Sequence, residues 1–197
     1  MVSRRLLCAS LAAALFAPVA SELVRAGPSD VQLMRAQLAR VTDGAFPGLQ
    51  LSVNWEFDLS PVLSDYLRRG IALYFAYEFR LMGPRLLWFD KTLVTSTLLQ
   101  RLSYSPLSRQ LRLSRDGLVQ SFDTLDQALL LLKNVRGWVV ADTDAIRNHT
   151  DVLAQTRMRL DLSRLPKPLQ VTIGGNSDWA LESDWQNIVL TKALDTN

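Results

Sequence analysis

Residues 92–140 read TLVTSTLLQRLSYSPLSRQLRLSRDGLVQSFDTLDQALLLLKNVRGWVV, and this stretch indicates how the chain folds. A turn is expected at Ser105-Pro106-Leu107-Ser108, because proline fixes the φ angle that suits the second turn position. A second reversal is expected at Asp116-Gly117, followed by a short strand. Thr124 and Gln127 then have the spacing of a capping box, which opens an apolar helix. The stretch therefore predicts a long strand, a return strand, a third short strand and a helix.

Segments outside this stretch alternate between apolar and polar residues, as strands with one buried face do. The strongest example is 49–60, where every second residue is apolar, and segment 152–162 repeats the pattern. Segment 71–81 is a second strong strand with a continuous apolar side, formed by Leu73, Phe75, Tyr77, Phe79 and Leu81. Such one-sided alternation is typical of antiparallel sheets. The apolar face of the first segment consists of Leu49, Leu51, Val53, Trp55, Phe57 and Leu59.

Shorter elements complete the predicted fold. Ser60-Pro61 opens a short helix that ends at Gly70, since serine caps helices and proline fits their first position. The prolines of 165–168 predict an extended linker, and 169–173 are expected to form an edge strand. Further strands are expected at 31–41, 138–140 and 186–191. The fold class is therefore expected to be mainly β (α+β), an antiparallel β-sandwich or partly open barrel with two short helices.

The first residues have the pattern of a secretory signal peptide. Arg4 and Arg5 supply its charged start, and residues 6–20 are apolar and uncharged. This run is shorter than the ~20 apolar residues of a membrane span, so no stable span is expected after the leader is removed. We predict a signal peptide at 1–21, with cleavage between residues 20 and 26. Residues 27–197 are predicted to form a single β-rich domain in the periplasm.

The charge and the cysteine content of the chain depend on this leader. Removal of Arg4 and Arg5 lowers the net charge from +3 to +1. The mature chain then gives no electrostatic case for nucleic acid or an anionic membrane as a partner. The one cysteine of the sequence, Cys8, lies within the leader. The mature protein is therefore expected to have no disulfide, no thiol nucleophile and no zinc–thiolate site.

Sequence motifs give no support to an enzyme. His149 is the only histidine of the sequence and lies between Asn148 and Thr150. Neither a multi-histidine metal site nor a Ser-His-Asp triad is expected from it. The Gly174-Gly175 pair lacks the spacing of a dinucleotide-binding loop, and the sequence contains no Walker motif. We therefore predict no catalytic residue, no metal and no cofactor.

Acidic and aromatic residues near the end of the sequence allow two interpretations. Asp178, Glu182 and Asp184 lie close to Trp179 and Trp185. A carbohydrate hydrolase needs two carboxylates at its site, and the tryptophans would supply a platform for the sugar. Alternatively, both tryptophans close the open end of the sheet while the acids stay in solvent, and this is the interpretation we favour. Trp179 and Trp185 are kept as candidate binding residues.

A second aromatic candidate follows the break at Gly83-Pro84. Trp88 and Phe89 adjoin Leu86-Leu87 in a segment without regular alternation. Large aromatic side chains are mostly buried, so sealing of the sheet edge is the preferred interpretation. The alternative is that Trp88 and Phe89 line an opening for an apolar ligand or a partner, because loops tend to carry function.

Seven segments spread over the mature chain carry a family resemblance. They are NWEFDLSP (54–61), GIALYF (70–75), RLSY (101–104), GLVQSF (117–122), RGW (136–138), DLSRLPKPLQ (161–170) and SDW (183–185). They resemble the bacterial domain-of-unknown-function family 4390 of exported proteins. The resemblance implies a signal peptide and a proteobacterial envelope setting, with no assigned activity and no catalytic residues. Members are similar in often being encoded beside a membrane sensor kinase, which implies a role in envelope sensing.

The sequence therefore favours an exported, non-enzymatic module that binds an unidentified protein partner in the cell envelope. This hypothesis rests on the leader, the alternating strands and the missing catalytic motifs. One alternative is a carrier that holds an apolar small ligand between the sheets near Trp88 and Phe89. A less favoured alternative is a carbohydrate hydrolase that uses Asp178, Glu182 and Asp184.

Overall fold

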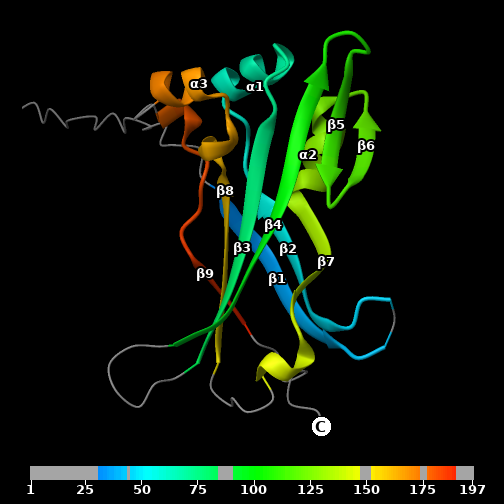
Figure 1. The fold of residues 1–197 in the computed structure, drawn as a ribbon, viewed down its shortest axis with the longest axis vertical. Coiled ribbons are helices and arrows are strands. Elements are labelled where there is room, and N and C mark those ends of the chain that lie inside the picture. Colours follow the sequence, from blue (N-terminus) through cyan, green and yellow to red (C-terminus); the bar gives the residue numbers. More distant parts are fainter. Residues whose placement is uncertain (1–30, 44, 84–90, 147–151, 174–176, 190–197) are drawn as a thin grey trace, which may run out of the picture.

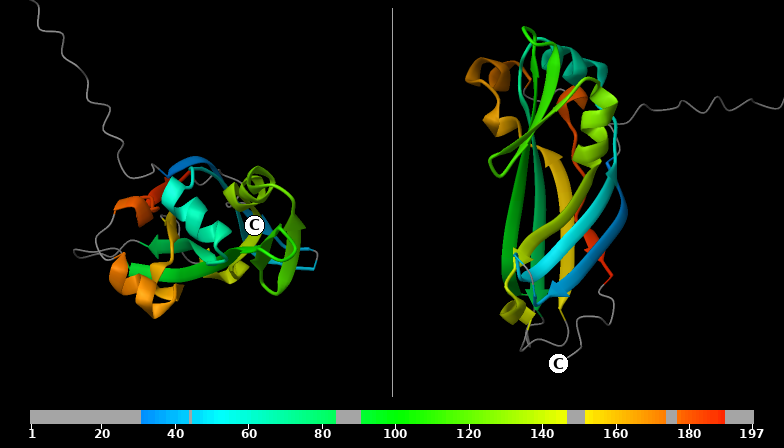
Figure 2. Two further views of the ribbon diagram at one scale, coloured as in Figure 1. Left: turned by 90° about the horizontal axis from the view of Figure 1, so that it is seen from above. Right: turned by 90° about the vertical axis from the view of Figure 1, so that its right-hand side faces the viewer.

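The computed structural model describes residues 31–43, 45–83, 91–146, 152–173 and 177–189. Within these residues, nine strands form two antiparallel sheets that lie face to face (Figure 1, Figure 2). The strands of the small sheet are β1 (Gln32–Val41), β2 (Gly48–Glu56) and β7 (Asn134–Ala141). The strands of the large sheet are β3 (Leu73–Gly83), β4 (Lys91–Ser105), β5 (Gln110–Arg115), β6 (Leu118–Phe122), β8 (Leu153–Leu160) and β9 (Gln186–Ile188).

The strand order explains why the two sheets remain open. The large sheet has the order β6-β5-β4-β3-β8-β9, and the small sheet has the order β1-β2-β7. Strands β6, β9, β1 and β7 are therefore the sheet edges within the described part of the chain, and the sheets do not close into a barrel. The predicted mainly β fold is confirmed in its sandwich form.

The apolar face of β2 lies at the centre of the core, as its alternation predicts. Leu49, Leu51 and Trp55 have no exposed surface, whereas Gln50 and Ser52 on the opposite face are half-buried. One hydrophobic cluster joins these side chains to those of β3, β4 and β8 in the facing sheet. The prediction that Trp55 belongs to the core is confirmed. Packing between the two sheets therefore holds the sandwich together.

The central strand β3 presents different chemistry on its two faces. Leu73, Phe75 and Tyr77 point into the core and are buried. Glu78 and Arg80, which lie on the opposite face, are half-buried. Because successive side chains of a strand point to opposite sides, the same strand supports the core and an outer polar surface.

The stretch 92–140 folds as its sequence predicts. β4 and β5 form a hairpin across the turn at 106–109, and β5 pairs with β6 across Asp116-Gly117. Asp116 has a φ of 49° and Gly117 a φ of 83°, the left-handed conformation that a two-residue hairpin turn requires. The long hairpin extends beyond the small sheet at the end where the helices gather (Figure 1, Figure 2).

Both predicted helices are present and have the predicted caps. Helix α1 (Pro61–Arg68) begins where the Ser60 hydroxyl accepts a hydrogen bond from the Leu63 amide at 3.1 Å. Helix α2 (Leu125–Lys133) begins where the Thr124 hydroxyl accepts one from the Gln127 amide at 3.4 Å. Among the described residues, no helix combines the length and apolarity that crossing a membrane requires.

The prediction of a linker at 165–168 and an edge strand at 169–173 is wrong. These residues instead contain a third helix, α3 (Lys167–Thr172), preceded by the short turn η2 (Leu162–Arg164). Pro168 lies in the first turn of α3, where a helix does not use the backbone N–H that proline lacks. The Gln170 side chain then ties α3 to the preceding segment, since its Nε2 donates to the Ser163 and Leu165 carbonyls at 2.7 Å.

Candidate functional site

A cleft of about 810 Å³ opens between the two sheets, and we call it the sandwich cleft. Its floor is the inner face of β4, β5 and β6, and its opposite wall is formed by α2 and β7. The volume falls within the range of roughly 300–1,000 Å³ that is common for ligand sites. The residues that line the sandwich cleft are Phe46, Ser96, Thr97, Leu98, Gln100, Leu113, Arg115, Asp116, Leu118, Gln120, Leu131, Asn134, Gly137, Trp138 and Val139.

Apolar side chains cover much of the sandwich cleft. Leu98 on β4, Leu113 on β5 and Trp138 on β7 are buried beside it. Leu118 and Phe46 lie at its mouth and are 76% and 71% exposed. Exposed apolar side chains beside a concave apolar wall are typical of a surface that binds another molecule.

Gln100 is a polar residue between the buried Leu98 and Leu102 on the inner face of β4. It pairs with Phe75 of β3 and is only 3% exposed. Its Oε1 atom is buried and has no hydrogen-bond partner among the described residues. A buried polar atom without a partner costs about 1–3 kcal/mol of folding free energy. Beside the sandwich cleft, Gln100 therefore holds a buried acceptor for which the described residues supply no donor.

Arg115 lies beside Gln100, because the two residues pair directly across β4 and β5. Its Nε atom is 3.5 Å from the carboxylate of Asp116, and its side chain is about one third exposed. The guanidinium also acts on the core residue Tyr77. Burial raises the pKa of the Tyr77 hydroxyl far above its ordinary value, and the nearby charge of Arg115 opposes that rise. The Tyr77 hydroxyl donates a hydrogen bond to the Leu132 carbonyl of α2.

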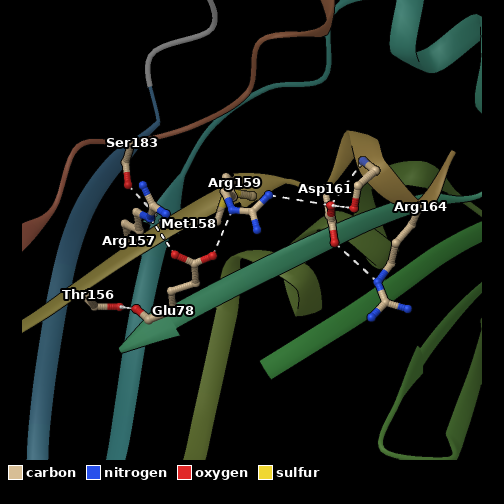
Figure 3. Close-up of polar contacts among 9 residues, drawn as sticks. Glu78, Thr156, Arg157, Met158, Arg159, Asp161, Arg164 and Ser183 are labelled. Carbon is tan, nitrogen blue, oxygen red and sulfur yellow. Dashed lines mark hydrogen bonds and ion pairs between the residues drawn. The ribbon is translucent and has the colours of Figure 1, made fainter. Parts of the chain in front are cut away.

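A second polar region, which we call the outer network, lies on the opposite face of the large sheet (Figure 3). Glu78 of β3 accepts hydrogen bonds from Arg157 Nε at 2.6 Å and from Arg159 Nε at 2.8 Å, both on β8. Burial alone would raise the pKa of Glu78, but its two arginine partners outweigh burial and hold the pKa below its ordinary value. Both oxygens of this carboxylate are therefore paired.

Asp161 extends the outer network to η2 (Figure 3). Its carboxylate accepts hydrogen bonds from the hydroxyl and the amide of Ser163, at 2.6 Å and 3.2 Å. Arg164 Nε lies 3.3 Å and Arg159 Nη1 3.6 Å from the same group. Burial raises the pKa of Asp161, but the Ser163 bonds and the arginine charges outweigh it, and the net pKa is lowered.

Two of the four aromatic residues predicted as binding candidates lie within the described residues, and their surroundings differ. Trp185 is half-buried beside the outer network, with the guanidinium of Arg80 4.0 Å and that of Arg157 4.7 Å from its ring centre. Trp179 lies in η3 (Ser177–Trp179), is 2% exposed, and its ring is 4.8 Å from that of Tyr66 on α1. Trp88 and Phe89 lie outside the described residues.

The acids and the aromatic rings of the suggested hydrolase site differ in their exposure to solvent. Asp178, Glu182 and Asp184 are all exposed. Trp179 packs against α1, and arginine side chains lie against the ring of Trp185. His149 lies outside the described residues. In the part of the chain that the structure describes, no three histidine, cysteine or acidic side chains gather in a way that could hold a metal ion.

Sequence reasoning missed Gln100 and Arg115, although their positions carry a signal. Gln100 follows Leu98 and precedes Leu102 on the inner face of β4, and Arg115 continues a face that begins with Leu111 and Leu113. A polar residue at an apolar position of a strand is the pattern that could have indicated the sandwich cleft. Gln100 and Arg115 become neighbours only through the pairing of β4 with β5.

Comparison with known proteins gives a family and nothing closer. The family model of a domain of unknown function, DUF4390, matches residues 29–189. That range contains both sheets, the sandwich cleft and the outer network. No curated protein and no solved structure matches the chain.

Proposed function

The chain belongs to the DUF4390 family of domains of unknown function, and from that premise we propose that it is an exported, non-enzymatic module that binds a partner protein in the periplasm. The sandwich cleft is the binding surface in this proposal. An envelope-sensing role is compatible with such a module, because a sensing protein must bind another molecule. No activity is assigned to the family, so the proposal rests on the features of the chain itself.

Export is supported by the leader pattern of the sequence. Arg4 and Arg5 precede an apolar, uncharged run at 6–20, and small residues follow that run. The expected product is a periplasmic chain that begins between residues 21 and 27. The intact mass of the protein recovered from the periplasm tests this expectation, and an uncut chain in the membrane fraction would contradict it.

Binding is supported by one observation above the others, the exposed apolar side chains of Leu118 and Phe46 beside a cleft that is also lined by Leu98, Leu113 and Trp138. Exposed apolar side chains beside a concave apolar wall are typical of a binding surface. A partner that enters the sandwich cleft can cover Leu118 and Phe46. The outer network offers no comparable surface, since the oxygens of Glu78 are bound by arginines of the same chain.

Site-specific photo-crosslinking in cells tests the proposal. A photoreactive amino acid at Leu118, on the rim of the sandwich cleft, should give a discrete adduct with an envelope protein. The matched control is Leu107, a 99% exposed leucine at the tip of the β4–β5 turn, outside the cleft lining. No adduct from Leu118, or the same adducts from both positions, would refute binding at the sandwich cleft.

The proposal that the protein is not an enzyme has its own test. Purified protein is expected to hydrolyse neither glycans nor esters. Hydrolysis that disappears in Asp184→Asn or Glu182→Gln at an unchanged melting temperature would contradict it. Both acids are exposed, so these substitutions are not expected to change stability, and a lost activity would have a chemical cause.

A carrier of an apolar small ligand is the second candidate, and the buried Leu98, Leu113 and Trp138 beside the sandwich cleft favour it. Organic extraction of protein purified from the periplasm, followed by mass spectrometry, separates the two candidates. A stoichiometric small molecule in the extract, lost in a Trp138→Ala variant, would replace the protein-binding proposal. Its absence together with a Leu118 adduct supports a protein partner.

A further inference from the structure

A second concavity lies on the small sheet, and we call it the small-sheet pocket. Its volume is about 480 Å³, within the range of roughly 300–1,000 Å³ that is common for ligand sites. Ser52 and Asn54, which line it, are on the face of β2 opposite the buried Trp55. The pocket meets the sandwich cleft at Asn134, which lines both. Its polar lining residues are Arg35 and Gln37 of β1, Ser52 and Asn54 of β2, and Asn134 and Arg136 of β7.

Two arginines flank the small-sheet pocket. Arg35 and Arg136 are exposed, and neither forms an ion pair within the described part of the chain. Strand β2 lies between β1 and β7, and neighbouring strands are ~4.8 Å apart, so the backbones that carry the two arginines are about 10 Å apart. Two long side chains can close that gap over β2, so both guanidiniums can contact one ligand.

Nearby acids leave the charge of these arginines available. Glu56 is the only acidic residue of β1, β2 and β7. Its carboxylate lies 2.5 Å from Lys133 Nζ, and that of Asp58 lies 3.6 Å from the same nitrogen. The small-sheet pocket is therefore locally basic, although the mature chain as a whole is expected to be close to neutral.

The floor of the small-sheet pocket supplies hydrogen-bonding groups of both kinds. Ser52 Oγ accepts a hydrogen bond from the Gly137 amide at 3.2 Å, so its own proton remains available to a ligand. Asn54 Nδ2 donates to Asn134 Oδ1 at 2.7 Å, which leaves Asn54 Oδ1 to accept. Asn134 Nδ2 in turn donates to the Leu130 carbonyl at 2.8 Å. These bonds fix the floor before a ligand arrives and leave one donor and one acceptor for it.

We propose that the small-sheet pocket binds the phosphate group of a hydroxyl-bearing phosphomonoester. Such a phosphate carries about −1.5 to −2 charges at pH 7 and three acceptor oxygens, which matches two guanidiniums and the Ser52 hydroxyl. Arginine binds these oxygens in pairs through its planar fork. A carboxylate has one charge and two oxygens, so it would leave one guanidinium without a counter-ion. A hydroxyl of the same molecule can donate to Asn54 Oδ1.

Isothermal titration calorimetry of the purified protein with glucose 6-phosphate, at low ionic strength, tests this inference. Glucose has the same hydroxyls without the phosphate and should not bind measurably. Arg35→Gln and Arg136→Gln should each weaken binding about tenfold, because each removes a charge-assisted hydrogen-bonding group. The matched control is Arg112→Gln, an exposed arginine on β5 outside the pocket lining, which should leave the dissociation constant unchanged.

Vesicles distinguish a soluble phosphomonoester from a lipid head group of the same chemistry. Co-sedimentation with phosphatidylcholine vesicles that contain phosphatidic acid, lost in the Arg35→Gln/Arg136→Gln double variant but not in Arg112→Gln, would assign a lipid. Binding of glucose 6-phosphate without co-sedimentation would assign a soluble ligand. Binding of neither probe, or equal weakening by Arg112→Gln, would overturn the site. Glucose that binds as tightly as glucose 6-phosphate would overturn the role of the phosphate. The inference does not depend on a protein partner at the sandwich cleft.

Discussion

The outer network and the floor of the sandwich cleft lie on opposite faces of the same large sheet, and they differ in how their polar atoms are paired. Glu78 and Asp161 are each bound by at least two side chains of this chain (Figure 3). Gln100, on the inner face two strands from β8, has a buried oxygen without a partner among the described residues. The two carboxylates of the outer network are therefore paired within the chain, whereas the Gln100 oxygen has no donor among the described residues.

This difference predicts opposite effects on stability. A paired network fixes the relative positions of β3, β8 and η2, so its loss should destabilise the protein. An unpaired buried oxygen lowers stability, so its removal should stabilise the protein. The predictions below perturb first the core that supports both regions, then the outer network, then Gln100 and finally Trp185.

The largest expected effect is that of Trp55→Ala in the shared core. Trp55 has no exposed surface, so its truncation removes transfer free energy and leaves a cavity. We expect a loss of about 3–5 kcal/mol, a large part of the ~5–15 kcal/mol that stabilises a typical domain. Chemical denaturation measures it. A loss below about 1 kcal/mol would show that the core does not depend on this residue.

Glu78→Gln should destabilise the protein by about 1–2 kcal/mol. The change leaves Arg157 and Arg159 without their shared countercharge, but both side chains are about one third exposed, so the loss is smaller than for a fully buried pair. Glu182→Gln, at an exposed acid, is the matched control. An unchanged denaturation midpoint for Glu78→Gln would show that the outer network does not stabilise the fold.

The outer network should also make stability depend on pH in the acid range. The pKa values of Glu78 and Asp161 are lowered in the folded protein from ordinary values of 4.5 and 3.8. Their contribution is therefore fully present above these values and is lost as the pH falls through the lower, folded pKa values. Denaturation midpoints measured across this range should fall less steeply for Glu78→Gln. If the denaturation midpoints of Glu78→Gln and of the unmodified protein fall equally with pH, the assignment of this pH dependence to Glu78 is contradicted.

Gln100→Leu should stabilise the protein by about 1 kcal/mol, because it removes a buried acceptor without a partner. The opposite signs expected at Gln100 and Glu78 are the sharpest test of the comparison. Gln32→Leu, on the exposed face of β1, should change stability by less than about 0.5 kcal/mol. A Gln100→Leu variant that is less stable than the unmodified protein would show that the amide is satisfied in solution.

The smallest expected effect is that of Trp185→Leu. This change keeps an apolar side chain but removes the ring against which Arg80 and Arg157 lie at 4.0 Å and 4.7 Å. We expect a loss of about 0.5–1 kcal/mol, the typical contribution of a partly exposed cation–π contact. Thermal melting measures it. A loss as large as that of Trp55→Ala would place Trp185 in the core.

Local patterns made much of the fold predictable. The alternation of β2, the caps at Ser60 and Thr124 and the turn at Asp116-Gly117 each depend on residues close in sequence, and the structure has all of them. The prediction at 165–173 was wrong because Pro168 lies in the first turn of a helix. Proline ends a helix when it lies in the interior, but it is tolerated in the first turn, where the missing N–H is not needed.

The candidate site was less predictable because pairing across strands creates it. Gln100 and Arg115 are fifteen positions apart, and only the register of the β4–β5 hairpin brings them together. Likewise, Arg80 and Trp185 meet only through the folded sheet. For Trp88 and Phe89 the sequence favoured sealing of the sheet edge over an apolar opening. Both residues lie outside the described residues, so neither interpretation is tested.

The order of the strands along the chain also determines when each sheet can form. Asn54 of β2 contacts Asn134 of β7 across 80 residues of sequence, and four strands of the other sheet lie between them. Pairings between such distant segments are formed slowly, on a scale of roughly milliseconds to seconds in small β-rich domains. Until β7 has paired with β2 and the large sheet has packed against them, the apolar face of the β1–β2 hairpin remains accessible to other chains. That hairpin is therefore exposed to aggregation while the protein folds.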